Sequence, residues 1–213
     1  TTMNTMVPDN HRIRHCHSFN TNLKILYFCF MVSFLILGFN GFLLGEGNYD
    51  TRFHHILPVD GLSQSTVHSI AQDRRGFMWF GTQDGLNRYD GYNFTIFRHD
   101  PDDPESLSDS FVRRILLDSE GTLWLGTNAG GLNRYDPGTG RFKRYPVSVN
   151  GSEGLSHSTV ESLAESPKGI IWVGTDAGLN RLDTRNGTKS GTFTVFQHTP
   201  KKNGTISNDY ILA

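Results

Sequence analysis

Three tryptophans and two aspartates are the first side chains of this 213-residue chain that could do chemistry. Trp79, Trp124 and Trp172 each open a Trp-hydrophobic-Gly-Thr motif, which is followed after two or three residues by Gly-Leu-Asn-Arg. A row of such aromatic rings could form a stripe that binds a ligand. Asp73 and Asp118 each stand six residues before a tryptophan and could act as a pair of carboxylates.

A second set of candidates lies at one equivalent position of three successive sequence units: His68, Arg113 and Glu161. A histidine and a glutamate close to a metal ion could carry out acid–base catalysis. The same position could equally be a solvated position of a strand. We therefore assign no catalytic residue from the sequence, and the ligand-binding residues stay unassigned.

Metal and nucleic-acid binding find little support in the composition. Both cysteines, Cys16 and Cys29, precede residue 46, so the repeated part has no disulfide and no thiolate ligand. His11–His17 contains ligand types, but nothing in their spacing fixes a coordination geometry. We predict no metal site and no cofactor. The formal net charge of −1 gives no electrostatic case for nucleic acid.

The elements that carry these residues repeat along the chain. The three tryptophans are 45 and 48 residues apart, a period typical of a repeat array. Alternating apolar runs separated by Gly-containing turns predict four short strands in each unit. The expected strands are 67–72, 77–82, 86–90 and 94–97 in the first unit, 112–118, 122–127, 132–136 and 142–145 in the second, and 160–166, 170–175, 179–183 and 193–196 in the third. Four antiparallel strands in such a unit are typical of a β-propeller blade, which predicts an all-β fold.

Recurrence assigns structural roles to most of the candidates. Ser166 replaces Asp73 and Asp118 in the third unit, which favours turn-forming acceptors over a carboxylate pair. The recurring tryptophans are expected to pack sheet against sheet. The glycine of the same motif, Gly81 in the first unit, predicts a close backbone approach, and Asn87 is expected to bind a loop backbone.

The amino-terminal segment has a different character. Ile25–Leu44 is almost continuously apolar, and twenty such residues in a helix would cover about 30 Å, the thickness of the bilayer core. Positive charges precede it at Arg12, Arg14 and Lys24, which favours a cytoplasmic amino terminus. We expect 1–22 to be a cytoplasmic leader and 23–45 a hydrophobic helix, either a signal peptide or a transmembrane anchor. The alternative is a buried helix of a soluble domain.

The repeats are expected to form a partial propeller over 51–213. Residues 52–57 have the form of a fourth strand and predict a closing strand. Blades follow at about 61–106, 107–154 and 155–205, and 206–213 matches the start of a fourth. Three blades cannot close a ring, because propellers have about four to eight. We therefore expect the ring to be partial and the chain to be the front end of a longer protein.

The pattern Leu-Ser-x-x-x-Val, then Asp-x-x-Gly-x-x-Trp-hydrophobic-Gly-Thr, then Gly-Leu-Asn-Arg-Tyr-Asp resembles the two-component regulator propeller repeat. The resemblance covers roughly 51–213, with Ser166 and Leu182 as departures. It implies the extracytoplasmic, ligand-sensing part of a bacterial inner-membrane receptor, with the propeller in the periplasm. It further implies a carbohydrate ligand, a homodimeric full-length receptor, and a cytoplasmic histidine kinase or diguanylate cyclase that this chain lacks.

Two other functions stay open. Streptogramin lyases resemble the chain loosely through a Trp-aromatic motif in each blade, although they lack the Gly-Thr and Gly-Leu-Asn-Arg continuation. A passive interaction scaffold, or a gene fragment, is the other alternative. In each case specificity is expected on the loops that differ among the repeats. These loops are 83–84, 128–130, 176–177, 98–106 and 146–154.

Overall fold

The computed structural model describes residue 53 and residues 55–148, 154–185 and 191–212. The expected leader (1–22) and hydrophobic helix (23–45) lie outside these residues. None of the helices within the described ranges has the length and apolar character needed to cross a bilayer.

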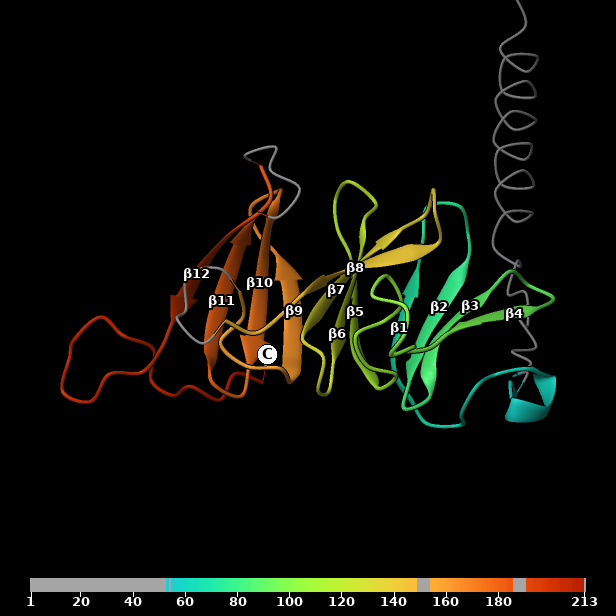
Figure 1. Cartoon of the computed structure of the whole chain (residues 1–213), viewed down its shortest axis with the longest axis horizontal. Helices are drawn as coiled ribbons and strands as arrows, with labels where there is room; N and C mark the ends of the chain where they lie inside the picture. Colours follow the sequence, from blue (N-terminus) through green and yellow to red (C-terminus); the bar gives the residue numbers. More distant parts are fainter. Residues whose placement is uncertain (1–52, 54, 149–153, 186–190, 213) are drawn as a thin grey trace, which may run out of the picture. The chain divides into compact units, whose positions relative to one another are not determined.

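The described residues form three separate sheets of four antiparallel strands, each ordered as the strands follow in the chain (Figure 1). A short 3-10 helix, η1 (Pro58–Asp60), precedes them. The first sheet contains β1 (Val67–Gln72), β2 (Met78–Thr82), β3 (Gly85–Tyr89) and β4 (Phe94–Phe97); the second contains β5 (Val112–Leu117), β6 (Leu123–Thr127), β7 (Leu132–Asp136) and β8 (Arg141–Tyr145); the third contains β9 (Val160–Glu165), β10 (Ile170–Thr175), β11 (Gly178–Asp183) and β12 (Thr192–Phe196). This confirms the expected four-stranded units, and every expected strand is present within a residue at either end.

The first strands of the sheets, β1, β5 and β9, face one another between neighbouring blades. The backbone N–H of Ile115 in β5 donates to Oγ of Ser69 in β1 at 3.0 Å. Val112 at the start of β5 lies against Gly81 of the first blade, and Val160 at the start of β9 lies against Gly126 of the second. These inner strands therefore form the junctions of the array.

Two of the motif tryptophans, Trp79 and Trp124, pack one blade on the next, as predicted, whereas Trp172 is part-buried and contacts Phe196 of its own blade. Trp79 is 1% exposed, and its ring centroid lies 5.0 Å from that of Tyr135 in the second blade. Trp124 is buried with Leu155 and Val173 of the third blade. Burying a large aromatic side chain at each junction supplies much of the apolar area that holds the blades together.

The motif glycines provide the close approach between blades that the sequence predicted. A Cβ added to Gly126 would lie 2.4 Å from Cγ1 of Val160. At Gly174 the same position would meet Cγ2 of Ile211 at 2.7 Å. Ile211 comes from the expected start of a fourth unit, and its N–H donates to the carbonyl oxygen of Thr175 at 3.1 Å. The segment after the third blade thus packs on it as Val160 packs on the second.

The aspartates are acceptors within turns, as expected. In the first blade, Oδ1 of Asp73 accepts from two backbone N–H groups of the turn, and Oδ2 accepts from the indole N–H of Trp79 at 3.1 Å. Asp118 repeats these contacts, with the indole nitrogen of Trp124 at 2.9 Å. In the third blade, the indole N–H donates to the carbonyl oxygen of Ser166 at 2.7 Å instead. Each tryptophan therefore keeps its hydrogen bond although one aspartate is missing.

The recurrent asparagines hold the Leu-Ser segment that opens each unit. In every blade the asparagine Oδ1 accepts from the serine backbone N–H at 2.8–3.0 Å, and Nδ2 donates to the serine Oγ at 2.7–3.0 Å. The pairs are Ser63 with Asn87, Ser108 with Asn133, and Ser156 with Asn180. All three asparagines are fully buried, so the prediction that they bind a loop backbone is confirmed.

The described residues do not test the closing strand expected at 52–57. Among its described residues, Phe53 and His55–Leu57 are in no strand, and Phe53 is 85% exposed. A closing strand would pair with a blade other than these three, so this role stays a prediction.

Candidate functional site at the rim of the blades

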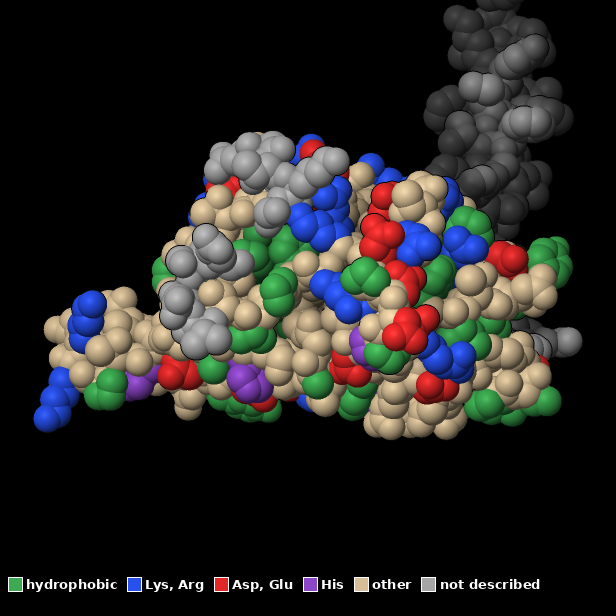
Figure 2. Space-filling view, viewed as in Figure 1, with side chains coloured by type: hydrophobic (Ala, Val, Ile, Leu, Met, Phe, Trp, Pro, Cys, Tyr) green, Lys and Arg blue, Asp and Glu red, His purple; other side chains and the backbone are tan. Residues whose placement is uncertain are grey.

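One end of the array brings together the loops on which specificity is expected. Val67 pairs with Thr82, and Leu86 pairs with Phe97, so the starts of β1 and β3 meet the ends of β2 and β4 at this end. We call it the rim; it is the lower edge of the blades in Figure 1. On the face in Figure 2, histidine side chains lie along or near this edge, interspersed with acidic ones.

Each inner strand has a β-bulge just inside the rim. The register slips by one residue between Val67 and Ser69, between Val112 and Arg114, and opposite Gly174 and Thr175 in the third blade. The extra residues are His68, Arg113 and Glu161, the three equivalent positions noted in the sequence. A bulge re-aims a side chain and bends its strand, so these three residues leave the regular alternation.

Arg113 and Glu161 form an ion pair across the junction of the second and third blades. Nη2 of Arg113 lies 2.6 Å from Oε1 and 2.9 Å from Oε2 of Glu161, whose side chain is only 4% exposed. Nη1 of Arg113 donates to Oδ1 of Asn128 at 2.8 Å. Nη2 of Arg114 is 3.9 Å from the same carboxylate. Two guanidinium groups therefore share one nearly buried carboxylate.

Aromatic contacts continue this cluster into the first blade. The ring centroids of His68 and Phe111 are 4.8 Å apart, and the guanidinium carbon of Arg113 is 5.8 Å from the Phe111 ring centroid. We call His68, Phe111, Arg113, Arg114, Asn128 and Glu161 the rim row. It crosses three blades, and its members differ in size and charge although the scaffold beneath them repeats.

The rim row does not have the geometry of an acid–base pair. Glu161 is occupied by Arg113, while His68 lies against Phe111 in another blade. Among the residues that the structure describes, no three histidine, cysteine or acidic side chains come together in a group that could hold a metal ion. The arrangement ties blades together and presents donors and an aromatic ring at the rim.

The short variable loops are fixed by contacts with their neighbours. Asp84 accepts two hydrogen bonds from the guanidinium of Arg98, at 3.0 and 2.9 Å, and this interaction lowers the pKa of Asp84. Oδ2 of Asp109 accepts from the N–H of Ala129 at 2.8 Å. These contacts join the 83–84 and 128–130 loops to the segment 98–111, which leads into β5.

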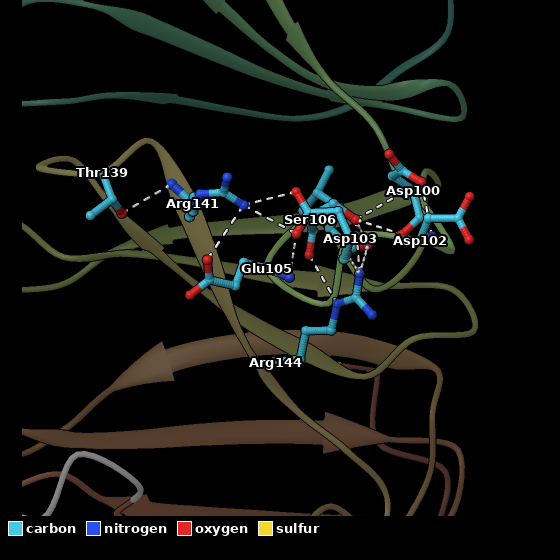
Figure 3. Close-up of polar contacts among 9 residues, drawn as sticks. Asp100, Asp102, Asp103, Glu105, Ser106, Thr139, Arg141 and Arg144 are labelled. Atoms are coloured by element: carbon cyan, nitrogen blue, oxygen red, sulfur yellow. Dashed lines mark hydrogen bonds and ion pairs between the residues drawn. The ribbon is translucent and has the colours of Figure 1, made fainter.

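The long loop 98–106 lies against the outer strand of the second blade and borders a cavity of about 390 Å³. Figure 3 shows Arg144 pointing into this loop, where its Nη2 donates to the carbonyl oxygens of Asp103 and Leu107 at 2.8 and 3.1 Å. Arg141 pairs with Asp103 at 2.9 Å, and the N–H of Phe142 donates to the Glu105 carbonyl at 2.8 Å. The polar groups thus hold the loop to β8. Most of the other long loop, 146–154, lies outside the described residues.

Phe111, Asn128 and Arg144 were not singled out from the sequence. The position before the inner-strand valine or isoleucine reads Thr66, Phe111, Thr159 and Tyr210 in successive units, so the departure of Phe111 was visible. Its contact with a histidine of another blade was not.

Comparisons with known proteins identify what the repeats are similar to. The model of the family described as two component regulator propeller matches 61–84, 106–129 and 154–177, one segment in each blade. A protein named histidine kinase P4 of Formosa agariphila is 43% identical over 75 residues, which are 35% of this chain and 6% of that protein.

Solved structures add support over a longer stretch. The extracellular domain of a hybrid two component system, BT3049 of B. thetaiotaomicron, has a TM-score of 0.61 and 28% identity over 68% of this chain. The corresponding domain of BT4673 has a TM-score of 0.55 and 26% identity over 72%. The chain spans only 20% and 19% of those domains. Each of the three blades therefore contains a segment that matches the two component regulator propeller model, and the chain is similar in fold to the extracellular domains of hybrid two component systems.

Proposed function

We propose that this chain is part of the extracytoplasmic sensor region of a bacterial two-component receptor and that its ligand is a carbohydrate. In this proposal the hydrophobic segment at 23–45 directs or anchors the protein at the inner membrane, and the propeller lies in the periplasm. A cytoplasmic kinase and a second receptor subunit complete the signalling unit. This chain itself binds a ligand and does not catalyse a reaction.

The observation that carries the proposal is the contrast between scaffold and rim. Ser–Asn pairs, tryptophans and glycines repeat in all three blades, whereas the bulge position at the rim carries a different residue in each one: His68, Arg113 and Glu161. Variable side chains on a rigid scaffold are where a binding protein sets its specificity. An aromatic ring beside polar side chains that hold one another in place also suits a ring-shaped, hydroxyl-rich ligand.

The test measures thermal stabilisation of the whole chain by a panel of oligosaccharides. A ligand that binds only the folded state raises the midpoint of unfolding as its concentration increases. Phe111→Thr installs the residue that the first and third blades carry at this position, and we expect it to abolish the rise. Tyr92→Thr removes an aromatic side chain that is 89% exposed in the turn between β3 and β4, away from the rim, and should leave the rise intact. If no glycan stabilises the chain, carbohydrate sensing by these blades is wrong.

A further inference from the structure

The rim row has more hydrogen-bond donors than acceptors. Glu161 is its one carboxylate, and both of its oxygens already face Nη2 of Arg113. Arg114 donates through Nη1 to the carbonyl oxygen of Arg113 at 3.0 Å. Within the described part of the chain, the Nε–H groups of both arginines have no protein partner. An arginine has five N–H donors and no acceptor, so these groups can take an acceptor from a ligand.

The nearby carboxylates also leave these two arginines available for a ligand. The neighbouring Asp109 is engaged through both oxygens with backbone N–H groups, at 3.2 Å from Phe111 and 2.8 Å from Ala129. On the third blade, Asp176 lies 3.9 Å from Nδ1 of His157. Neither carboxylate contacts Arg113 or Arg114. These two side chains are 26% and 35% exposed, so a ligand can reach them from solvent.

We propose that the rim row binds an acidic sugar, with Arg113 and Arg114 receiving its anionic group and Phe111 lying against the sugar ring. This inference rests on the proposed function and names the ligand class of the same site. Arginine binds carboxylates in a bidentate manner, and such charge-assisted hydrogen bonds are shorter and stronger than neutral ones. Glu161 and Asn128 act as positioning residues, because they hold the guanidinium of Arg113 in one orientation.

The other blades supply the variant that tests this assignment. Ser69 and Ser162 occupy the position of Arg114 in the first and third blades. Arg114→Ser therefore removes one cation, keeps the Arg113–Glu161 pair, and installs a residue that this scaffold already accepts. The control is Arg98→Gln, which removes a rim arginine outside the row; Gln197 is the corresponding residue of the third blade.

The experiment measures binding of digalacturonate, neutral galactobiose and inorganic sulfate to the whole chain by calorimetry. We expect digalacturonate to bind, galactobiose to bind at least about tenfold more weakly, and sulfate alone to bind weakly or not at all. Arg114→Ser should weaken digalacturonate binding by about tenfold or more, whereas Arg98→Gln should change it less than about twofold. Binding should also weaken as salt is raised, because the attraction is ionic.

Three results would overturn the proposal in different ways. Equal affinity for the acidic and neutral disaccharides, unaffected by Arg114→Ser, would remove the acidic class and leave carbohydrate sensing standing. Sulfate binding as tight as digalacturonate binding would show a simple anion site. Absence of binding by every sugar, acidic or neutral, would overturn both this inference and the proposed function.

Discussion

Gly126→Ala is the sharpest test of how the blades join. The added Cβ would lie 2.4 Å from Cγ1 and 2.8 Å from Cβ of Val160, whereas carbon atoms normally sit about 3.5–4.0 Å apart. The overlap exceeds 1 Å, and Val160 is fully buried at the start of β9, so it has little room to move. Overpacking a filled interior typically costs about 1–3 kcal/mol, and this geometry places Gly126→Ala near 3 kcal/mol.

The assay is equilibrium unfolding in urea, with the free energy of unfolding taken from the midpoint and slope. Gly138→Ala is the matched control, because its Cβ would meet only Oδ1 of the flexible Asp136 side chain at 3.3 Å. The double variant Gly126→Ala/Val160→Ala removes the clashing methyl groups. It should be more stable than the sum of the two single effects predicts, by at least about 1 kcal/mol.

A close junction at Gly126 is refuted if Gly126→Ala and Gly138→Ala differ by less than about 0.5 kcal/mol, the usual range for a harmless surface change. Strict additivity of Gly126→Ala and Val160→Ala would also refute it, because the two sites would then not touch.

The buried polar contacts give three further predictions. Asn133→Ala leaves the Leu-Ser segment of the second blade without its partner and should cost about 1–3 kcal/mol in urea unfolding. In Asp118→Asn the amide oxygen can still accept the backbone hydrogen bonds of the turn, but the amide nitrogen cannot accept from the indole N–H of Trp124, so the thermal midpoint should fall. Asp136→Asn is the control and should lower the midpoint less, because the amide oxygen can still accept from the N–H of Gly138. Arg185 holds the pKa of Asp183 far below its usual 3.8. The stability from this pair is therefore full above about pH 4 and is lost as pH falls towards the folded-state pKa. The thermal midpoint of Arg185→Gln should lie below that of the unchanged chain at pH 7, and the difference should shrink at pH 3; a constant difference would contradict this.

The repeat made most of the fold predictable. Three copies of one motif showed which positions stay constant, and constant positions could be given roles in packing, turning and capping. The replacement of Asp73 and Asp118 by Ser166 is enough, from the sequence alone, to separate turn chemistry from catalysis. In two of the blades the carboxylate also accepts a part-buried hydrogen bond from the indole N–H of the tryptophan, a role that the sequence did not indicate.

The candidate site was less predictable, because it depends on features that occur once. The bulge at Arg113 is seen only in the register of β5 against β6, and Arg113 and Arg114 both lie close to Glu161 there. Phe111 meets His68 across 43 positions of sequence, a contact that no local pattern encodes. Arg144, which holds the 98–106 loop, is likewise particular to the second blade, because Ile96 and Val195 occupy its position in the other two.

The contact between a motif glycine and the first inner-strand residue of the following unit has a genetic consequence. Gly81 with Val112, Gly126 with Val160 and Gly174 with Ile211 are three copies of one junction. Because every junction is built from the same parts, duplication or unequal recombination of a whole unit would recreate a compatible junction on both sides. A gene of this kind can therefore gain, lose or exchange blades together with their rim residues, because the new neighbours form the same type of junction.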